Sequence, residues 1–273
     1  MKKLVLLFVS IWVMLSCQAA QAQSFVKNET SSMLEYFVLN NPDEAWNTDE
    51  LYVFLATESG MSGETLTDIK KDLNSFIGYL KSKNEKYKKD ESFLKLVFKE
   101  VQKRYLKSYT PVSTFANTMQ YGKYDCLTGT MLYAVILKAL DYDFAVYETN
   151  YHVYLKTQTE EGKVILFEST DPYKGFESSD YRISKREKGY ALRQGGSFSY
   201  TKSIHQVVSL KELAGLQYFN LAVESFNNRD YDTALLDLKK TSVFYYSNRL
   251  TEIELLILAS NGLPMNDSEV VKW

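Results

Sequence analysis

The chain has 273 residues, with 32 lysines and arginines against 34 aspartates and glutamates, but only 2 cysteines and 2 histidines. Hydrophobic residues make up 45% and charged residues 24% of the sequence, which excludes a disordered or fibrous protein. A net charge of −2 gives no electrostatic footprint for nucleic acid. Two cysteines without a CxxC pair exclude a disulfide framework and suggest neither zinc nor thioredoxin-type redox chemistry.

The first 22 residues have the composition of a secretory signal peptide. Lys2 and Lys3 precede an apolar run from Leu4 to Leu15, and Ala20 and Ala22 form an Ala-x-Ala end. The apolar run is shorter than the roughly 20 residues of a transmembrane helix. We expect cleavage after Ala22 and export, to a bacterial periplasm.

A second interpretation of the same segment stays open. Met14 to Cys17 resembles a bacterial lipobox, in which the cysteine is lipidated and becomes the new N-terminus. The protein would then be an envelope protein anchored to the membrane at Cys17. In either case Cys126 is the one free thiol of the mature chain.

Residues 23–108 are predicted to form an N-terminal helical region. Apolar residues recur there at steps of three and four, which is the spacing of an amphipathic helix. The repeating residues are Leu66, Ile69, Leu73, Phe76, Ile77 and Leu80, then Phe93, Leu94, Val97, Val101 and Tyr105.

Residues 109–209 combine one helix with several strands. After an irregular loop over 109–118, the spacing of apolar residues predicts a helix over 127–140. Runs dense in Val, Tyr and Phe predict three consecutive antiparallel strands, and a loop-rich segment with one further strand follows. The four predicted strands cover residues 143–149, 152–157, 164–169 and 205–208. This order predicts the α+β class, with a helix packed on an antiparallel sheet.

Residues 210–273 are predicted to form a helical tail. One helix begins around Tyr218 and contains Ala222, and a second follows Asp230 and contains Ala234. This spacing resembles a tetratricopeptide repeat, whose small residues let two helices pack closely. About one and a half repeats are present, whereas about three are needed for independent stability. We therefore expect the tail to pack on the preceding domain and to offer a surface to a protein partner.

Three residues carry the candidate chemistry. Cys126 opens the predicted helix, His152 lies on the second strand, and Asp171 follows the third strand. A thiol nucleophile is favoured at a helix N-terminus, where the helix dipole stabilises thiolate. The thiol needs a histidine beside it and a carboxylate that orients that histidine.

The stretch from Tyr121 to Gly175 resembles the transglutaminase-like superfamily, whose core is papain-like and whose chain order is Cys, His, Asp. The matching segments are Asp125-Cys126 before an apolar helix, Tyr151-His152-Val153-Tyr154, and Glu168-Ser169-Thr170-Asp171-Pro172. The resemblance implies Cys126 as nucleophile, His152 as base and Asp171 as orienting acid. It also implies Gln120 as an oxyanion donor, beside the backbone N–H of Cys126.

Two functions follow as expectations. The first is an exported thiol hydrolase or transamidase that acts on an amide or peptide bond of a peptide or protein, without metal or organic cofactor. The second is an inactive envelope protein that binds a partner through its cleft and tail. It is motivated by Lys123-Tyr124-Asp125 and Val153-Tyr154, where many superfamily members have Gly before the Cys and Trp after the His. His205 lacks any matching context and is expected to be structural or exposed.

Overall fold

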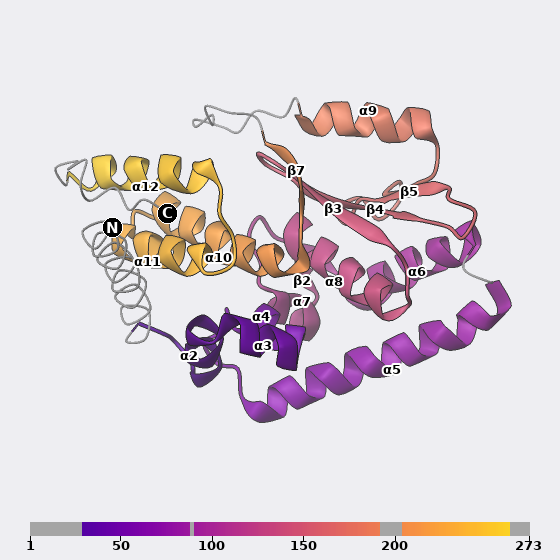
Figure 1. Cartoon of the computed structure of the whole chain (residues 1–273), viewed down its shortest axis with the longest axis horizontal. Helices are drawn as coiled ribbons and strands as arrows, with labels where there is room; N and C mark the ends of the chain where they lie inside the picture. Colours follow the sequence, from indigo (N-terminus) through magenta and orange to yellow (C-terminus); the bar gives the residue numbers. More distant parts are fainter. Residues whose placement is uncertain (1–28, 88–89, 192–203, 263–273) are drawn as a thin grey trace, which may run out of the picture.

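The computed structural model describes residues 29–87, 90–191 and 204–262 (Figure 1). The predicted leader, with its two alternatives at Ala22 and Cys17, lies outside the described residues. The predicted α+β class is confirmed, because helices pack around one antiparallel sheet. None of the helices in the described ranges is long and apolar enough to cross a membrane.

Helices occupy the N-terminal region, as the spacing of apolar residues predicts. They are α2 (Met33–Asn40), α3 (Pro42–Thr48), α4 (Glu50–Leu55), α5 (Gly63–Tyr87) and α6 (Glu91–Arg104). Capping side chains fix the starts of α2 and α6: Ser32 accepts a hydrogen bond from the backbone of Glu35, and Asp90 accepts one from that of Phe93. The apolar face of α6 is buried, so this helix is part of the main core.

The sheet has five strands in the order β6-β5-β4-β3-β7, each antiparallel to its neighbours. The strands are β3 (Phe144–Thr149), β4 (Val153–Gln158), β5 (Val164–Phe167), β6 (Phe176–Glu177) and β7 (His205–Val208). A short parallel pair, β1 (Ser108–Tyr109) and β2 (Lys123–Tyr124), leads into helix α8 (Cys126–Ala139). Strands β3, β4, β5 and β7 lie close to the four predicted positions, and α8 matches the predicted helix, whereas the two-residue strands β1, β2 and β6 were not predicted.

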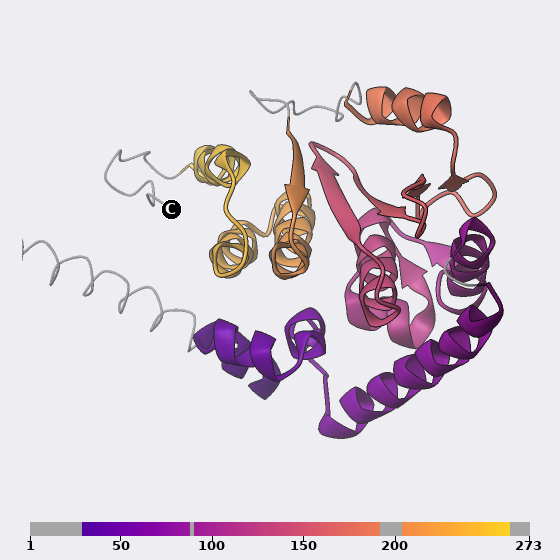
Figure 2. The ribbon, with the colours of Figure 1, turned by 45° about the vertical axis from the view of Figure 1, so that its right-hand side comes forward.

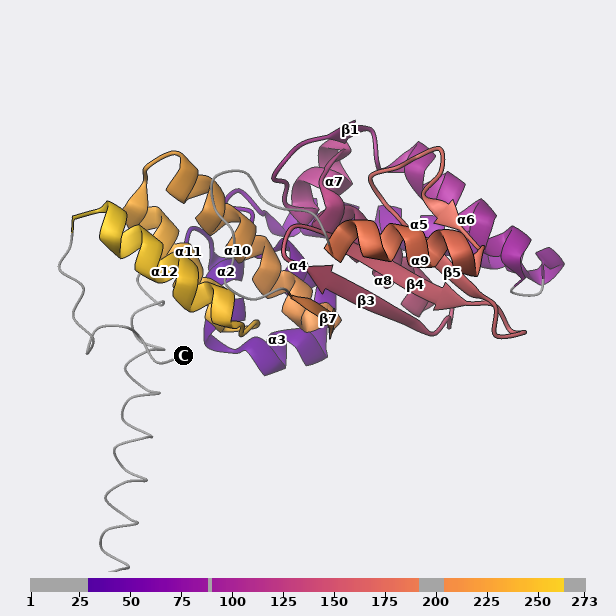
Figure 3. The same ribbon diagram turned by 90° about the horizontal axis from the view of Figure 1, so that it is seen from above.

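Helices cover both faces of the sheet (Figures 1 and 3). Helix α8 packs on β3 and β4, and Leu155 and Phe167 belong to the main core on that face. Successive side chains of a strand point to opposite faces. Tyr154 therefore lies on the other face, where it packs with Ile183 and Tyr190 of α9 (Asp180–Ala191).

Two helices occupy segments for which the sequence predicted irregular structure. Helix α7 (Phe115–Tyr121) begins inside the expected loop over 109–118, where the hydroxyl of Thr114 caps it by accepting from the N–H of Asn117. Helix α9 lies in the segment interpreted as loop-rich. Both expectations were wrong. A helix that packs with only one face can be stabilised by very few buried residues, and in α9 only Ile183 and Tyr190 are buried.

The tail forms three helices, α10 (Leu210–Asn227), α11 (Tyr231–Ser242) and α12 (Asn248–Ser260) (Figure 2). Ala222 and Ala234 are fully buried, as their proposed role in close helix packing requires. The tail also packs on the rest of the chain, because the buried amide of Gln217 accepts from the backbone of Phe115 at 2.8 Å and donates to the carbonyl of Phe54 at 3.2 Å. The assignment to a tetratricopeptide repeat stays a prediction.

Candidate active site

Cys126 is the first residue of α8, and the residue before it fixes this helix start. The Asp125 carboxylate accepts hydrogen bonds from the backbone N–H of Thr128 at 2.7 Å and of Ser113 at 3.0 Å. The Thr128 hydroxyl accepts in return from the Asp125 N–H, which completes a capping box. Asp125 is therefore a buried structural clamp that holds Cys126 at a helix N-terminus.

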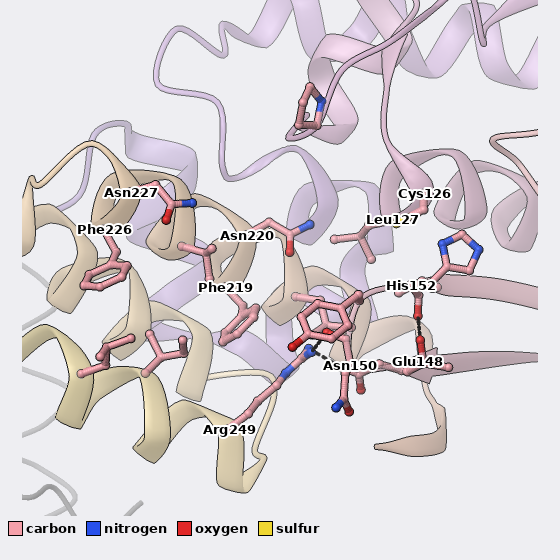
Figure 4. Close-up of a pocket in the computed structure, with 18 of the residues that line it drawn as sticks. Cys126, Leu127, Glu148, Asn150, His152, Phe219, Asn220, Phe226, Asn227 and Arg249 are labelled. Carbon is pink, nitrogen blue, oxygen red and sulfur yellow. Dashed lines mark hydrogen bonds and ion pairs between the residues drawn. The ribbon is translucent and has the colours of Figure 1, made fainter. Parts of the chain in front are cut away.

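Cys126 and His152 line one cavity of about 720 Å³. Figure 4 shows the two residues together at one end, with Phe226 and Asn227 of α10 at the other. The hydroxyl of Thr130, in the second turn of α8, donates a hydrogen bond to the carbonyl of Val153, the residue after His152, at 3.3 Å. The start of α8 and the start of β4 are thus in direct contact.

The His152 ring is held from its far side by Glu168. Its Nε2 atom lies 2.6 Å from Glu168 Oε2, and both side chains are buried. A carboxylate on Nε2 leaves Nδ1 as the nitrogen available to a thiol, and Figure 4 shows the ring beside Cys126. The structure therefore places imidazole and carboxylate in direct contact, with the thiol lining the same cavity as the imidazole, and the carboxylate is Glu168.

Glu168 is fixed by further donors. The Tyr190 hydroxyl donates to Oε2 at 2.6 Å, and the hydroxyl and backbone N–H of Thr170 donate to Oε1 at 2.6 and 3.1 Å. Burial alone would raise the pKa of Glu168, but the hydrogen bond and charge of His152, with the bonds from Thr170 and Tyr190, lower it to about 2. The carboxyl group is therefore ionised throughout the physiological pH range.

Asp171 does not contact His152 in the way the sequence led us to expect. Its carboxylate accepts from the backbone N–H of Lys174 at 2.9 Å and from the Arg186 guanidinium at 2.9 Å. Burial opposes ionisation, but these bonds lower the pKa of Asp171. The residue stabilises the turn after β5 and ties it to α9, while Glu168, three residues earlier, holds the imidazole.

The register of the strands favours Glu168 over Asp171 as the partner of His152. Leu155 pairs with Phe167 across β4 and β5, so Glu168 lies opposite Tyr154. Alternation along β4 then puts His152, Tyr154 and Glu168 on the same face of the sheet. The chain order Cys, His, Asp pointed to Asp171 because it takes no account of this register.

Cys126 is partly buried, and its environment disfavours the thiolate. Burial and the negative charge of Asp125 raise the pKa of the Cys126 thiol to about 12, with a smaller contribution from Glu168. The N–H groups of Val153 and Leu127 act in the opposite direction but are outweighed. The sequence led us to expect the helix dipole to favour thiolate, whereas burial of the thiol, with two carboxylates beside the helix start, outweighs that effect.

Gln120 and His205 lie elsewhere. Gln120 is exposed at the C-terminal end of α7 and is not among the residues that line the cavity. His205 is an exposed residue of β7 whose Nε2 lies 3.0 Å from the Tyr154 hydroxyl. The structure therefore does not bring Gln120 to the expected oxyanion position, and His205 lies on the surface as expected.

The tail supplies the far wall of the cavity, which no sequence motif indicated. The lining residues of α10 and α12 are Leu216, Phe219, Asn220, Val223, Phe226, Asn227, Arg249, Ile253 and Leu256. Most of these side chains are apolar, and the charge of Arg249 is neutralised by an ion pair with Glu148. The wall is therefore suited to uncharged groups.

The described residues contain no group of three or more His, Cys, Asp and Glu side chains that could hold a metal ion. Comparisons of the chain with protein-family models, curated proteins and solved structures gave no match. The chemistry of the site must therefore be inferred from its own atoms: a thiol at a helix N-terminus, an imidazole that lines the same cavity, and an ionised carboxylate behind the imidazole.

Proposed function

We propose that the protein is an exported thiol hydrolase of papain-like, transglutaminase-like fold that cleaves an amide or peptide bond. The observation that carries this proposal is the buried pair of His152 Nε2 and Glu168 Oε2 at 2.6 Å, beside Cys126 at the start of α8. Thiol hydrolases require such an oriented imidazole next to the nucleophile.

In the proposed reaction the Cys126 sulfur attacks the carbonyl carbon of the substrate and its proton passes to His152 Nδ1. His152 then delivers this proton to the amide nitrogen as the C–N bond breaks, which leaves a thioester on Cys126. Water, deprotonated by His152, hydrolyses the thioester and restores the thiol. An amine in place of water gives transamidation.

The raised pKa of Cys126 favours proton transfer during the attack over a preformed thiolate–imidazolium pair. Glu168 holds the imidazole tautomer that carries its proton on Nε2, so that Nδ1 can accept. The first N–H groups of α8 have no partner within the helix and are the proposed donors to the developing oxyanion.

The cavity favours an uncharged peptide as substrate. Its volume of about 720 Å³ is in the range of pockets that enclose a drug-sized ligand, which is the size of a short peptide segment. Phe219, Val223 and Phe226 give the α10 wall an apolar surface. Asn220 and Asn227, two helical turns apart, offer amides that can pair with a peptide backbone.

A library of blocked peptides with uncharged and charged residues around the scissile bond tests this proposal. We expect the chain from residue 23 onward to cleave uncharged members and the Cys126→Ala variant to cleave none. Equal cleavage by the two proteins would refute a thiol mechanism. Cleavage confined to charged peptides would refute the assignment of the substrate.

The second candidate is a binding protein of the cell envelope that uses the same cavity without turnover. The specific observation in its favour is the pKa of Cys126, which leaves little thiolate at neutral pH. Under this alternative, Cys126→Ala complements loss of the gene as well as the unaltered sequence does, whereas under the first it does not.

A further inference from the structure

A buried ion pair connects the helical tail to the β3–β4 hairpin, which carries His152. Glu148, near the end of β3, is fully buried, and Arg249 in the first turn of α12 donates to its carboxylate. Arg249 also donates to the carbonyl oxygen of Asn150, in the turn of the hairpin, at 3.4 Å. Figure 4 shows this side chain reaching from the tail to the hairpin.

Further groups fix both members of this pair. The Tyr245 hydroxyl, just before α12, lies 2.9 Å from both carboxylate oxygens of Glu148, and the Gln206 amide on β7 donates to one of them at 2.9 Å. The Arg249 guanidinium lies over the Phe219 ring, 4.2 Å from its centroid. The buried carboxylate thus accepts from three residues, two of them in the tail segment, so the cluster ties the tail to the hairpin.

Residues of the same hairpin also contact His152 and helix α8. Glu148 is paired with Val153 across β3 and β4, and the Val153 carbonyl accepts a hydrogen bond from the Thr130 hydroxyl of α8 at 3.3 Å. The N–H and hydroxyl of Thr149 donate to the His152 carbonyl at 2.8 and 3.1 Å. A displacement of Glu148 is therefore transmitted to both His152 and helix α8, which begins at Cys126.

We propose that Arg249 and Tyr245 are positioning residues of the active site: through Glu148 they hold the hairpin so that the His152 ring meets Cys126. This inference rests on the proposed hydrolase function and assigns the tail a place in the site, in contrast to a tail that serves only to bind a partner. Neither residue needs to touch the substrate for this role.

Nuclear magnetic resonance of the imidazole nitrogens tests the proposal independently of turnover. The chain has only two histidines, so a His205→Ala variant assigns their signals. We compare Arg249→Met with Lys240→Met, a matched control. Lys240 forms an equally buried ion pair, 3.0 Å from Glu35, that anchors the tail to α2 and does not involve the hairpin.

We expect Arg249→Met to shift or broaden the His152 ring signals and to slow acylation of Cys126 by an activated ester at least tenfold. Arg249→Lys should restore part of the signal positions and part of the acylation rate. Lys240→Met should lower the melting temperature but leave the His152 signals in place and the acylation rate within twofold of that of the unaltered protein. Unchanged His152 signals and rate in a folded Arg249→Met protein would overturn the proposal.

If Arg249→Met does not fold, Tyr245→Phe, which removes one hydroxyl, replaces it in the test. We then expect shifted His152 signals and a rate at least threefold lower, and the absence of both changes would overturn the proposal. If no variant, including the unaltered protein, is acylated, the hydrolase function fails. The His152 signals still decide whether the tail positions the hairpin.

Discussion

Substitution of Glu168 by Gln tests which of two carboxylates, that of Glu168 or that of Asp171, orients His152. Glu168 accepts from His152, Tyr190 and Thr170, and its pKa falls from 4.5 to about 2 in the folded protein. Such a fall favours the folded state by about 3 kcal/mol at neutral pH. We expect Glu168→Gln to lose about this amount at pH 7, because the amide carries no charge and cannot accept all of these bonds.

The pH dependence has a definite sign. The folded-state pKa lies below the unfolded one, so the contribution is fully present above about pH 5 and is lost as the pH falls to about 2. The stability difference between the unaltered protein and Glu168→Gln should therefore shrink over this window. Asp171→Asn is the control: this carboxylate is one-third exposed, and its ion pair with Arg186 should contribute less than about 1 kcal/mol.

Urea denaturation followed by circular dichroism at pH 7, 4 and 3 gives the free energies of unfolding. The rate of Cys126 acylation at pH 7 gives the functional effect. Loss of an orienting carboxylate costs up to about 10⁴-fold in the serine protease triad, which sets the upper limit for Glu168→Gln. A larger effect of Asp171→Asn than of Glu168→Gln, on stability or on rate, would refute our assignment of the orienting acid.

Three further predictions concern the start of α8. Alkylation of Cys126 by iodoacetamide should be slower at pH 8 than that of a free cysteine and should rise about tenfold per pH unit to pH 10, since the pKa is about 12; a plateau below pH 8 would contradict that pKa. Gly129→Ala should cost about 1–3 kcal/mol by urea denaturation, because the new Cβ would lie 2.8 Å from the Ser169 Cβ; an unchanged midpoint would show that the loop can yield. Asp125→Ala should cost about 2 kcal/mol and exceed Asp230→Ala, whose capping bond to α11 is exposed and 3.3 Å long; the reverse order would contradict the clamp role.

The sequence predicted the elements that carry the site because each has a strong local signal. Helix α8 is apolar around its circumference and begins at an Asp that caps it. Strands β3, β4 and β5 are short runs of β-branched and aromatic residues separated by turn residues. Local patterns of this kind place Cys126 and His152 at the ends of rigid elements, which is sufficient to predict that they are candidates.

The identity of the third residue depends on non-local geometry. Glu168 and Asp171 are both acidic and lie three residues apart after the same strand. Only the register of β5 on β4 and the position of α9, with Tyr190 against Glu168, separate them. Helix α9 has few buried residues and many charges, so little in its sequence indicates the element that completes the site.

The wall contributed by the tail was unpredictable for a similar reason. Residues of α10 and α12 meet the hairpin only after the chain has folded back over about 100 residues, and Arg249 and Glu148 share no local motif. Which charges become buried, and therefore need a partner, is decided by the folded structure and not by a local motif.

The central claim is that Cys126 acts as a nucleophile activated by His152. Its most direct test is the intact mass of the protein after rapid mixing with an activated peptide ester at neutral pH. We predict one acyl group per chain, located on Cys126 by peptide mapping, formed at least 100-fold faster than in His152→Ala and absent from Cys126→Ala. Equal acylation of the unaltered protein and His152→Ala, or acyl groups on other residues only, would contradict the claim.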